Sequence, residues 1–150
     1  MRNIKKILIS LVIPCNNEQK AIMPFILESE KLAAQHQLHF EYLFINDGSH
    51  DKTLEALQSA QEQFKGINII DFTRNFGKEA ALTAGLQHAR GDVIIPIDVD
   101  GEDSPDVIVD MLEKWQSGAN HIIAIRECRK NDPLFKRITA QIFYKVFNSM

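Results

Sequence analysis

The 150 residues, of which 45% are hydrophobic and 25% are charged, have the length and composition of one globular domain that buries a core. The formal net charge of -3 excludes the broad basic surface typical of nucleic-acid-binding proteins, so we expect no nucleic-acid partner. Cys15 and Cys128 form no CxxC or Cys/His spacing. This argues against a zinc site and against a disulfide framework, and it favours a reducing cytoplasm.

The chain begins with Arg2, Lys5 and Lys6 ahead of the apolar run Ile7–Ile13, a pattern that imitates a short signal peptide. Pro14 stands where a signal peptide has a small residue before its cleavage point, so a first core strand explains the run better. No apolar run approaches the roughly 18 to 20 residues that span a bilayer, and the sequence predicts no transmembrane helix.

Short β-branched apolar runs alternate with longer segments of helical period, which is the pattern of βαβ units around a parallel sheet. The expected strands are Ile7–Ile13, Phe40–Ile45, Ile67–Phe72, Val93–Ile97 and His121–Ile125. The expected helices are Glu18–Gln35, Asp51–Phe64, Lys78–Ala89 and Pro105–Gln116, the last with Ser104 as its N-cap. The predicted fold class is therefore α/β, with a mostly parallel sheet flanked by helices.

Polar residues follow four of the expected strands, at the edge of a parallel sheet where ligands bind. The four clusters are Pro14–Glu18, Asn46–Ser49, Thr73–Lys78 and Asp98–Asp103. Taken alone, each has an ordinary structural explanation as a turn, a helix start or a set of solvated loop charges. Because four separate loops bring donors or carboxylates to one edge, a functional site is the better interpretation.

Two carboxylates, Asp98 and Asp100, follow the apolar run Val93–Ile97. Side chains alternate along a strand, so these two are expected to point to the same side. They would repel each other unless a positive charge lay between them, and oxygen-only ligands suit Mg²⁺ or Mn²⁺. The chain has neither a GxGxxG turn nor a GxxxxGK[ST] loop, so a metal is expected to hold any bound phosphates.

The order of the motifs Pro14–Glu18, Asn46–Ser49 and Asp98–Asp100 resembles that of the family 2 inverting glycosyltransferases of the GT-A fold. Their pattern runs Pro-x-x-Asn-Glu, then Asp-Asp-Gly-Ser, then Asp-x-Asp. Within that family, the segment Arg74–Ala81 is most similar to the polyprenyl-phosphate branch, which includes bactoprenol glucosyltransferases and dolichyl-phosphate mannose synthase. The resemblance covers nearly the whole chain and implies a GT-A fold.

Four positions depart from the family pattern. Asn16 replaces the usual aromatic residue, Asn46 replaces the first Asp of Asp-Asp-Gly-Ser, and Gly101 and Glu102 replace a Leu and a Gln after the Asp-x-Asp motif. The change at residue 101 is expected to loosen the metal-binding loop.

The resemblance also implies roles for individual residues. The nucleotide-binding residues would be Pro14, Asn17, Glu18, Asp47 and Lys78. Asp98 and Asp100 would be the catalytic pair and would hold Mg²⁺ or Mn²⁺ on the diphosphate, with Glu102 as a third metal ligand in the place of a Gln. Arg126 and Arg137 would meet the phosphate of the acceptor, because the planar guanidinium binds phosphate with two hydrogen bonds.

The implied activity is the transfer of a hexose, with inversion, from a nucleotide diphosphate sugar such as UDP-glucose to a polyprenyl phosphate. Such an enzyme of cell-envelope polysaccharide synthesis is expected in the cytoplasm, at the inner face of the membrane. One alternative is an inactive remnant that binds the nucleotide sugar without turnover. A nucleotidyltransferase is disfavoured, because Pro14–Glu18 contains no Gly-rich loop with Arg or Lys.

Residues 1–150 are expected to form a single GT-A-like catalytic domain that is incomplete at its C-terminus, since the family's domain continues further. Six apolar residues recur at helical spacing near the end of the chain: Leu134, Phe135, Ile138, Ile142, Val146 and Phe147. With basic residues opposite them, they predict an amphipathic helix over Leu134–Phe147 that lies on an anionic membrane. Docking on the rest of the domain or on a second copy of the chain, as a homo-oligomer, stays open as the alternative.

Overall fold

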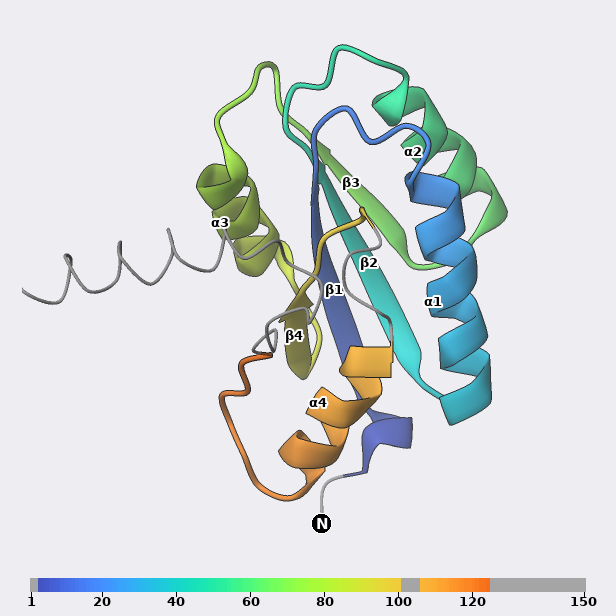
Figure 1. Ribbon diagram of the computed structural model, residues 1–150, viewed down its shortest axis with the longest axis vertical. Helices are drawn as coiled ribbons and strands as arrows, with labels where there is room; N and C mark the ends of the chain where they lie inside the picture. Colours follow the sequence, from blue (N-terminus) through green and yellow to red (C-terminus); the bar gives the residue numbers. More distant parts are fainter. Residues whose placement is uncertain (1–2, 101–105, 125–150) are drawn as a thin grey trace, which may run out of the picture.

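The computed structural model describes residues 3–100 and 106–124, and its central feature is a parallel sheet with helices on both faces (Figure 1). The strands are β1 (Leu8–Cys15), β2 (His39–Asn46), β3 (Ile67–Asp71) and β4 (Val93–Pro96). The helices are the 3₁₀ turn η1 (Ile4–Lys6), α1 (Ile22–His36), α2 (Thr53–Gln63), α3 (Lys78–His88) and α4 (Asp106–Gln116). The strand order is β3-β2-β1-β4 with parallel pairing throughout, which confirms the predicted α/β class.

Alternate residues of β1 face two separate hydrophobic clusters. The larger cluster joins Ile9, Leu11 and Ile13 to buried residues of α1, α2 and α4. The smaller cluster joins Val12 to β2 and to Ala81 of α3. The largely buried β1 and β2 therefore consist mainly of apolar residues, as expected for parallel strands covered on both faces.

Helix α3 approaches the sheet closely at Gly85. A Cβ atom added to this glycine would lie 2.3 Å from Cγ1 of Val12 and 2.8 Å from Cδ1 of Ile45. Val12 is β-branched and restricted at χ1, so its Cγ1 cannot move aside cheaply, whereas Cδ1 of Ile45 is the end of a side chain and can shift. A glycine at residue 85 thus sets how near α3 can lie to β1 and β2, and α3 in turn carries Lys78 at its first turn.

Helix α1 begins at Ile22, four residues later than the sequence predicts. Proline has no backbone N–H, so it fits only in the first turn of a helix, where that group would have no partner. Pro24 is the third residue of α1 and satisfies this limit, whereas a start at Glu18 would have placed it in the helix interior. The residues before the helix belong to the loop that follows β1, where the N–H of Glu18 donates to Oγ1 of Thr53 at 2.9 Å.

The predicted fifth strand His121–Ile125 is wrong over its described part, because residues 121–124 have no regular secondary structure. Ile125, Gly101, Glu102, Ser104, Pro105, Arg126, Cys128, Arg137 and the expected helix Leu134–Phe147 lie outside the described residues. Within the ranges that the structure describes, no helix is long and apolar enough to cross a membrane.

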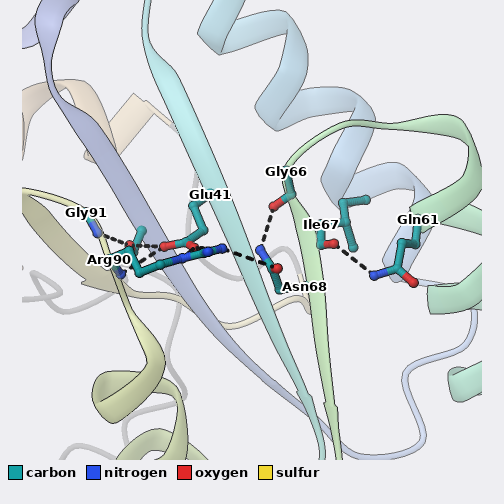
Figure 2. Close-up of polar contacts among 8 residues, drawn as sticks. Glu41, Gln61, Gly66, Ile67, Asn68, Arg90 and Gly91 are labelled. Atoms are coloured by element: carbon teal, nitrogen blue, oxygen red, sulfur yellow. Dashed lines mark hydrogen bonds and ion pairs between the residues drawn. The ribbon is translucent and has the colours of Figure 1, made fainter.

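A polar network ties the amino ends of β1, β2 and β4 together (Figure 2). The carboxylate of Glu41, which is only 3% exposed, accepts hydrogen bonds from Oγ of Ser10 at 2.6 Å and from the backbone N–H and Nε of Arg90 at 3.0 and 2.8 Å. The N–H of Gly91 donates to Oγ of Ser10 at 2.8 Å, and the Arg90 guanidinium reaches Oδ1 of Asn68 on β3. These bonds fix the loop that enters β4 against the other three strands.

Candidate functional site

The loops after β1, β2 and β3 rise beyond the same end of the sheet, at the top of Figure 1. Together with the residues that follow β4, they form a pocket of about 280 Å³. Its lining combines carboxylates, an ammonium group and amides with apolar side chains: Pro14, Cys15, Asn16, Glu18, Asp47, Asn75, Gly77, Lys78, Asp98, Val99 and Asp100. This is the carboxyl edge, where parallel sheets bind ligands.

Six of the residues singled out from the sequence line this pocket: Pro14, Glu18, Asp47, Lys78, Asp98 and Asp100. Asn17 is not among the lining residues, and Glu102, Arg126 and Arg137 lie outside the described part of the chain. Cys15, Asn16, Asn75, Gly77 and Val99 also line the pocket, although the sequence assigned none of them an individual role. Their signal was that they lie within the polar clusters that follow the strands.

Asp98 and Asp100 both line the pocket, but they do not belong to a continuation of strand β4, which the predicted alternation of their side chains requires. Strand β4 ends at Pro96, and residues 99 and 100 lie in a turn, so strand alternation does not explain their common direction. Val99 is 4% exposed and anchors this turn in the core between the two carboxylates. The turn therefore holds both carboxylates at the pocket while it buries the residue that separates them.

Asp47 holds the loop between β3 and α3 against the end of β2. Its side chain is nearly buried, and its two carboxylate oxygens accept from the backbone N–H groups of Phe76 at 2.7 Å and Gly77 at 2.9 Å. Gly48 next to it has a φ of +61°, and a Cβ there would lie 2.2 Å from the backbone carbon of Arg74. Only glycine fits this contact, and a nucleobase would have to use the remaining lone pairs of Asp47.

Asn17 joins the loop after β1 to the loop after β2. It has a φ of +60°, a conformation that Asn tolerates better than most residues, and its Oδ1 accepts from the N–H groups of His50 and Asp51 at 2.8 and 3.3 Å. Its own N–H donates to Oγ of Ser49 at 2.9 Å. In the structure Asn17 therefore shapes the pocket wall through the backbone of both loops.

Negative charge gathers on one side of the pocket. Burial, followed by the charges of Asp100, Asp51 and Asp98, raises the pKa of Glu18 above its ordinary value. The ammonium group of Lys78 balances part of this charge, because its Nζ lies 2.7 Å from Oδ2 of Asp98. The side chains of this pair are 58% and 36% exposed, so the ion pair is open to exchange with a ligand.

Within residues 3–100 and 106–124, no three His, Cys, Asp or Glu side chains gather closely enough to hold a metal ion by themselves. Mg²⁺ in phosphate-transfer sites is commonly held by only one or two carboxylates plus substrate phosphates and water. Asp98 and Asp100 supply such a pair of carboxylates, in which all donor atoms are oxygen. The ion pair between Lys78 and Asp98 shows that a positive charge is accommodated beside them. The donor set thus fits a divalent cation that arrives with a diphosphate.

The thiol of Cys15 lines the pocket but is not suited to nucleophilic chemistry. Burial, with smaller contributions from the charges of Glu18 and Asp98, raises the pKa of Cys15 far above its ordinary value. Because the thiolate is the reactive form, the protonated side chain acts as a small apolar wall of the pocket.

Comparison with known proteins places this geometry in a family. The model of glycosyl transferase family 2 matches residues 10–149. A prophage bactoprenol glucosyl transferase homolog of Escherichia coli (strain K12) is 45% identical over 142 residues, which is 95% of this chain and 46% of that protein. The bactoprenol glucosyl transferase of Shigella phage SfV is 44% identical over the same shares of the two chains.

The chain thus spans about half the length of the curated relatives that it matches. Among solved structures, glucosyl-3-phosphoglycerate synthase from Mycobacterium tuberculosis, in complex with Mn²⁺, UDP-glucose and phosphoglyceric acid, superposes with a TM-score of 0.57. It is 21% identical and covers 75% of this chain and 40% of that one, which establishes the shared GT-A type of fold. By its family model and by these relatives, the chain belongs to glycosyl transferase family 2.

Proposed function

We propose that this chain forms the nucleotide-sugar site of a glycosyltransferase that moves a hexose from a UDP-sugar to a polyprenyl phosphate. The observation that carries the proposal is the convergence of Glu18, Lys78, Asp98 and Asp100, from three loops, in one pocket at the carboxyl edge of the sheet. One of the two relatives is named as a bactoprenol glucosyl transferase and the other as a homolog of one, and these names support a polyprenyl acceptor and a glucosyl donor.

The donor nucleotide would lie against the loops after β1 and β2. Pro14 and Glu18 line the pocket there, and Asn17 and Asp47 fix the backbone of the surrounding loops. Lys78 would leave Asp98 and donate to the diphosphate, since its ammonium group is exposed and its present partner is a surface carboxylate.

Asp98 and Asp100 would hold Mg²⁺ or Mn²⁺, with Glu102 as a further candidate ligand from the segment outside the described residues. A divalent cation in this position, when bound, supplies a Lewis acid for the departing diphosphate. Asp98 and Asp100 would hold the cation, and Lys78 would add a second positive charge on the leaving group. One in-line attack at the anomeric carbon then inverts its configuration.

The acceptor phosphate would approach from the side opposite the diphosphate. A phosphate oxygen is already ionised, so the attack needs no strong general base, unlike transfer to a hydroxyl group. Arg126 and Arg137 are the proposed phosphate-binding residues. Such an enzyme would work at the inner face of the cytoplasmic membrane, where the lipid acceptor is found.

Isothermal titration calorimetry tests the donor site directly. We expect UDP to bind in the presence of Mn²⁺, more tightly than GDP, and its affinity to fall when EDTA removes the metal. Equal affinity with and without EDTA would overturn the metal role.

Hexose transfer from UDP-glucose to undecaprenyl phosphate is then measured on this chain and on any longer form of the reading frame. If both forms bind the nucleotide but neither transfers the hexose, the chain is an inactive remnant.

Lys78→Met is expected to separate metal binding from nucleotide binding. Once the ammonium group of Lys78 is removed, no lysine competes with the metal for Asp98. Mn²⁺ alone should therefore bind up to about fivefold more tightly, which corresponds to the free energy of an exposed ion pair. UDP affinity at saturating Mn²⁺ should instead fall, because a donor to the diphosphate is lost. Electron paramagnetic resonance of free Mn²⁺ measures the first change, and calorimetry measures the second.

The matched control is Lys52→Met, which removes another exposed lysine that pairs with a carboxylate, Glu55, at 3.9 Å on α2. This variant should change neither affinity. If Lys78→Met weakens Mn²⁺ binding instead, Lys78 does not compete with the metal for Asp98.

A further inference from the structure

The loop between β3 and α3 carries two aromatic rings and a guanidinium group in contact. We call Phe72, Arg74 and Phe76 the rim cluster. The rings of Phe72 and Phe76 meet edge to face with centroids 5.5 Å apart, and Cζ of Arg74 lies 4.7 Å from the centroid of the Phe76 ring. These distances are typical of favourable aromatic pairs and of cation–π contacts. The three side chains therefore form one amphipathic unit.

The rim cluster borders the pocket. Asn75 and Gly77, on either side of Phe76, both line the pocket, and so does Lys78. Phe72 is half-buried and packs against the small core cluster beneath α3, so it anchors the unit in the fold. The ring of Phe76 lies beyond it and is 52% exposed.

Phe76 is exposed although its backbone is firmly held. Its N–H donates to the carboxylate of Asp47, and the preceding residues lie directly against Gly48. The loop is thus held so that the ring projects outward next to the pocket. Leu27 on α1 has a similar exposure of 53%, but no ring or cation contact accompanies it, so it is an ordinary surface residue.

Arg74 offers its charge to a ligand. Its side chain is exposed, and it has no ion pair with a carboxylate among the residues that the structure describes. An exposed aromatic ring beside an arginine is the combination that binds the boundary between phosphate headgroups and acyl chains: the ring enters the apolar layer and the guanidinium binds phosphate.

We propose that the rim cluster docks this protein on an anionic lipid surface, with Phe76 inserted among the acyl chains and Arg74 paired with lipid phosphate. The proposal rests on the proposed function, because a lipid-borne acceptor requires the pocket to open at the membrane. It assigns that contact to the loop that also carries Gly77 and leads directly into Lys78 of α3, so docking places the mouth of the pocket at the level of the lipid phosphates.

Co-sedimentation of the intact chain with vesicles tests the docking. Vesicles of phosphatidylglycerol and phosphatidylcholine are compared with vesicles of phosphatidylcholine alone. We expect Phe76→Ser to lower the partition coefficient on the anionic vesicles about tenfold, and Arg74→Gln to lower it about fivefold, the contribution of one basic residue near such a surface. The Arg74→Gln effect should disappear at high salt, where the surface charge is screened.

Two control variants match these changes elsewhere on the surface. Leu27→Ser removes an equally exposed apolar side chain from α1, and Lys65→Gln removes an exposed cation near the amino end of β3. Both should partition like the unchanged protein. An equal loss for Phe76→Ser and Leu27→Ser, or no loss for Phe76→Ser, would overturn the assignment of docking to the rim cluster.

UDP binding with Mn²⁺, measured on the same samples, separates this proposal from the proposed function. Phe76→Ser should bind UDP within about twofold of the unchanged protein, because only its backbone N–H contacts Asp47. If the unchanged protein binds UDP and Mn²⁺ but Phe76→Ser leaves vesicle binding intact, the docking proposal fails and the donor site stands. If the unchanged protein binds vesicles but no nucleotide, the proposed function fails.

Discussion

Asp100→Asn is expected to lower the affinity for UDP in the presence of Mn²⁺ at least about tenfold, since even changes outside the ligand shell of a metal site cost that much. The same substitution should leave the melting temperature of the ligand-free protein unchanged or slightly higher. Asp100 is among the charges that raise the pKa of Glu18, so removing its charge relieves repulsion between carboxylates in the pocket. Asp98→Asn should behave in the same way, because its exposed pair with Lys78 contributes at most about 1 kcal/mol.

Calorimetry and thermal unfolding on the same samples measure the two effects. Asp110→Asn is the matched control, because it removes an exposed carboxylate on α4 that does not line this pocket. A fall of several degrees in the ligand-free melting temperature for Asp100→Asn would mean that this residue is structural. Unchanged UDP affinity would remove it from the proposed metal site.

Glu41→Gln is expected to lower the free energy of unfolding by about 2 kcal/mol at pH 7, the size of a lost hydrogen bond to a charged group. The Glu41 carboxylate accepts bonds from Ser10 and from the backbone and side chain of Arg90 (Figure 2). An amide has one oxygen, and its NH₂ group would face donors where the carboxylate presents an acceptor. The substitution therefore leaves a buried donor without a partner.

The stability contributed by Glu41 should also depend on pH. Burial alone would raise the pKa of Glu41, but the hydrogen bonds from Ser10 and Arg90 and the positive charge of Arg90 outweigh it and hold the pKa below its ordinary value near 4.5. A carboxyl group with a lowered pKa stabilises the fold above its ordinary pKa and loses that contribution as the pH falls through its value in the folded state.

Urea unfolding at pH 7 and at pH values below 4 measures this dependence. The difference between the unchanged protein and Glu41→Gln should be largest at pH 7 and should shrink on acidification. Glu62→Gln, an exposed carboxylate on α2, serves as the control and should change stability little at either pH. A difference that stays constant with pH would show that the charge of Glu41 is not what stabilises the network.

The sequence predicted the four described strands and their helices because apolar periodicity reports local burial. It missed the start of α1, since the backbone of Glu18 is taken up by Thr53, 35 residues further along the chain. The strand at His121–Ile125 was predicted from a short β-branched apolar run that follows a helical segment, but such a run becomes a strand only where a neighbouring strand pairs with it. No described strand pairs with residues 121–124.

For the candidate site, the sequence predicted which residues gather but not how they contact one another. Motif positions named six of the residues that line the pocket, because a parallel sheet gathers the loops that follow its strands at one edge. The individual contacts could not be predicted: that Asp47 binds the N–H groups of Phe76 and Gly77, or that Lys78 pairs with Asp98, depends on how two loops meet in space. The rim cluster was missed for the same reason.

The Glu41 network and the pocket occupy opposite ends of the same strands. From Glu41 to Asp47 along β2 is about 20 Å at 3.3 Å per residue, well beyond the range at which substitutions usually interact. The effects on stability of substitutions in the pocket should therefore add to, and not depend on, those of substitutions that strengthen the amino end. A protein whose stability is reinforced far from the pocket can tolerate substitutions in the proposed donor site, which makes it a suitable starting point for altering the ligand preference of that pocket by directed evolution.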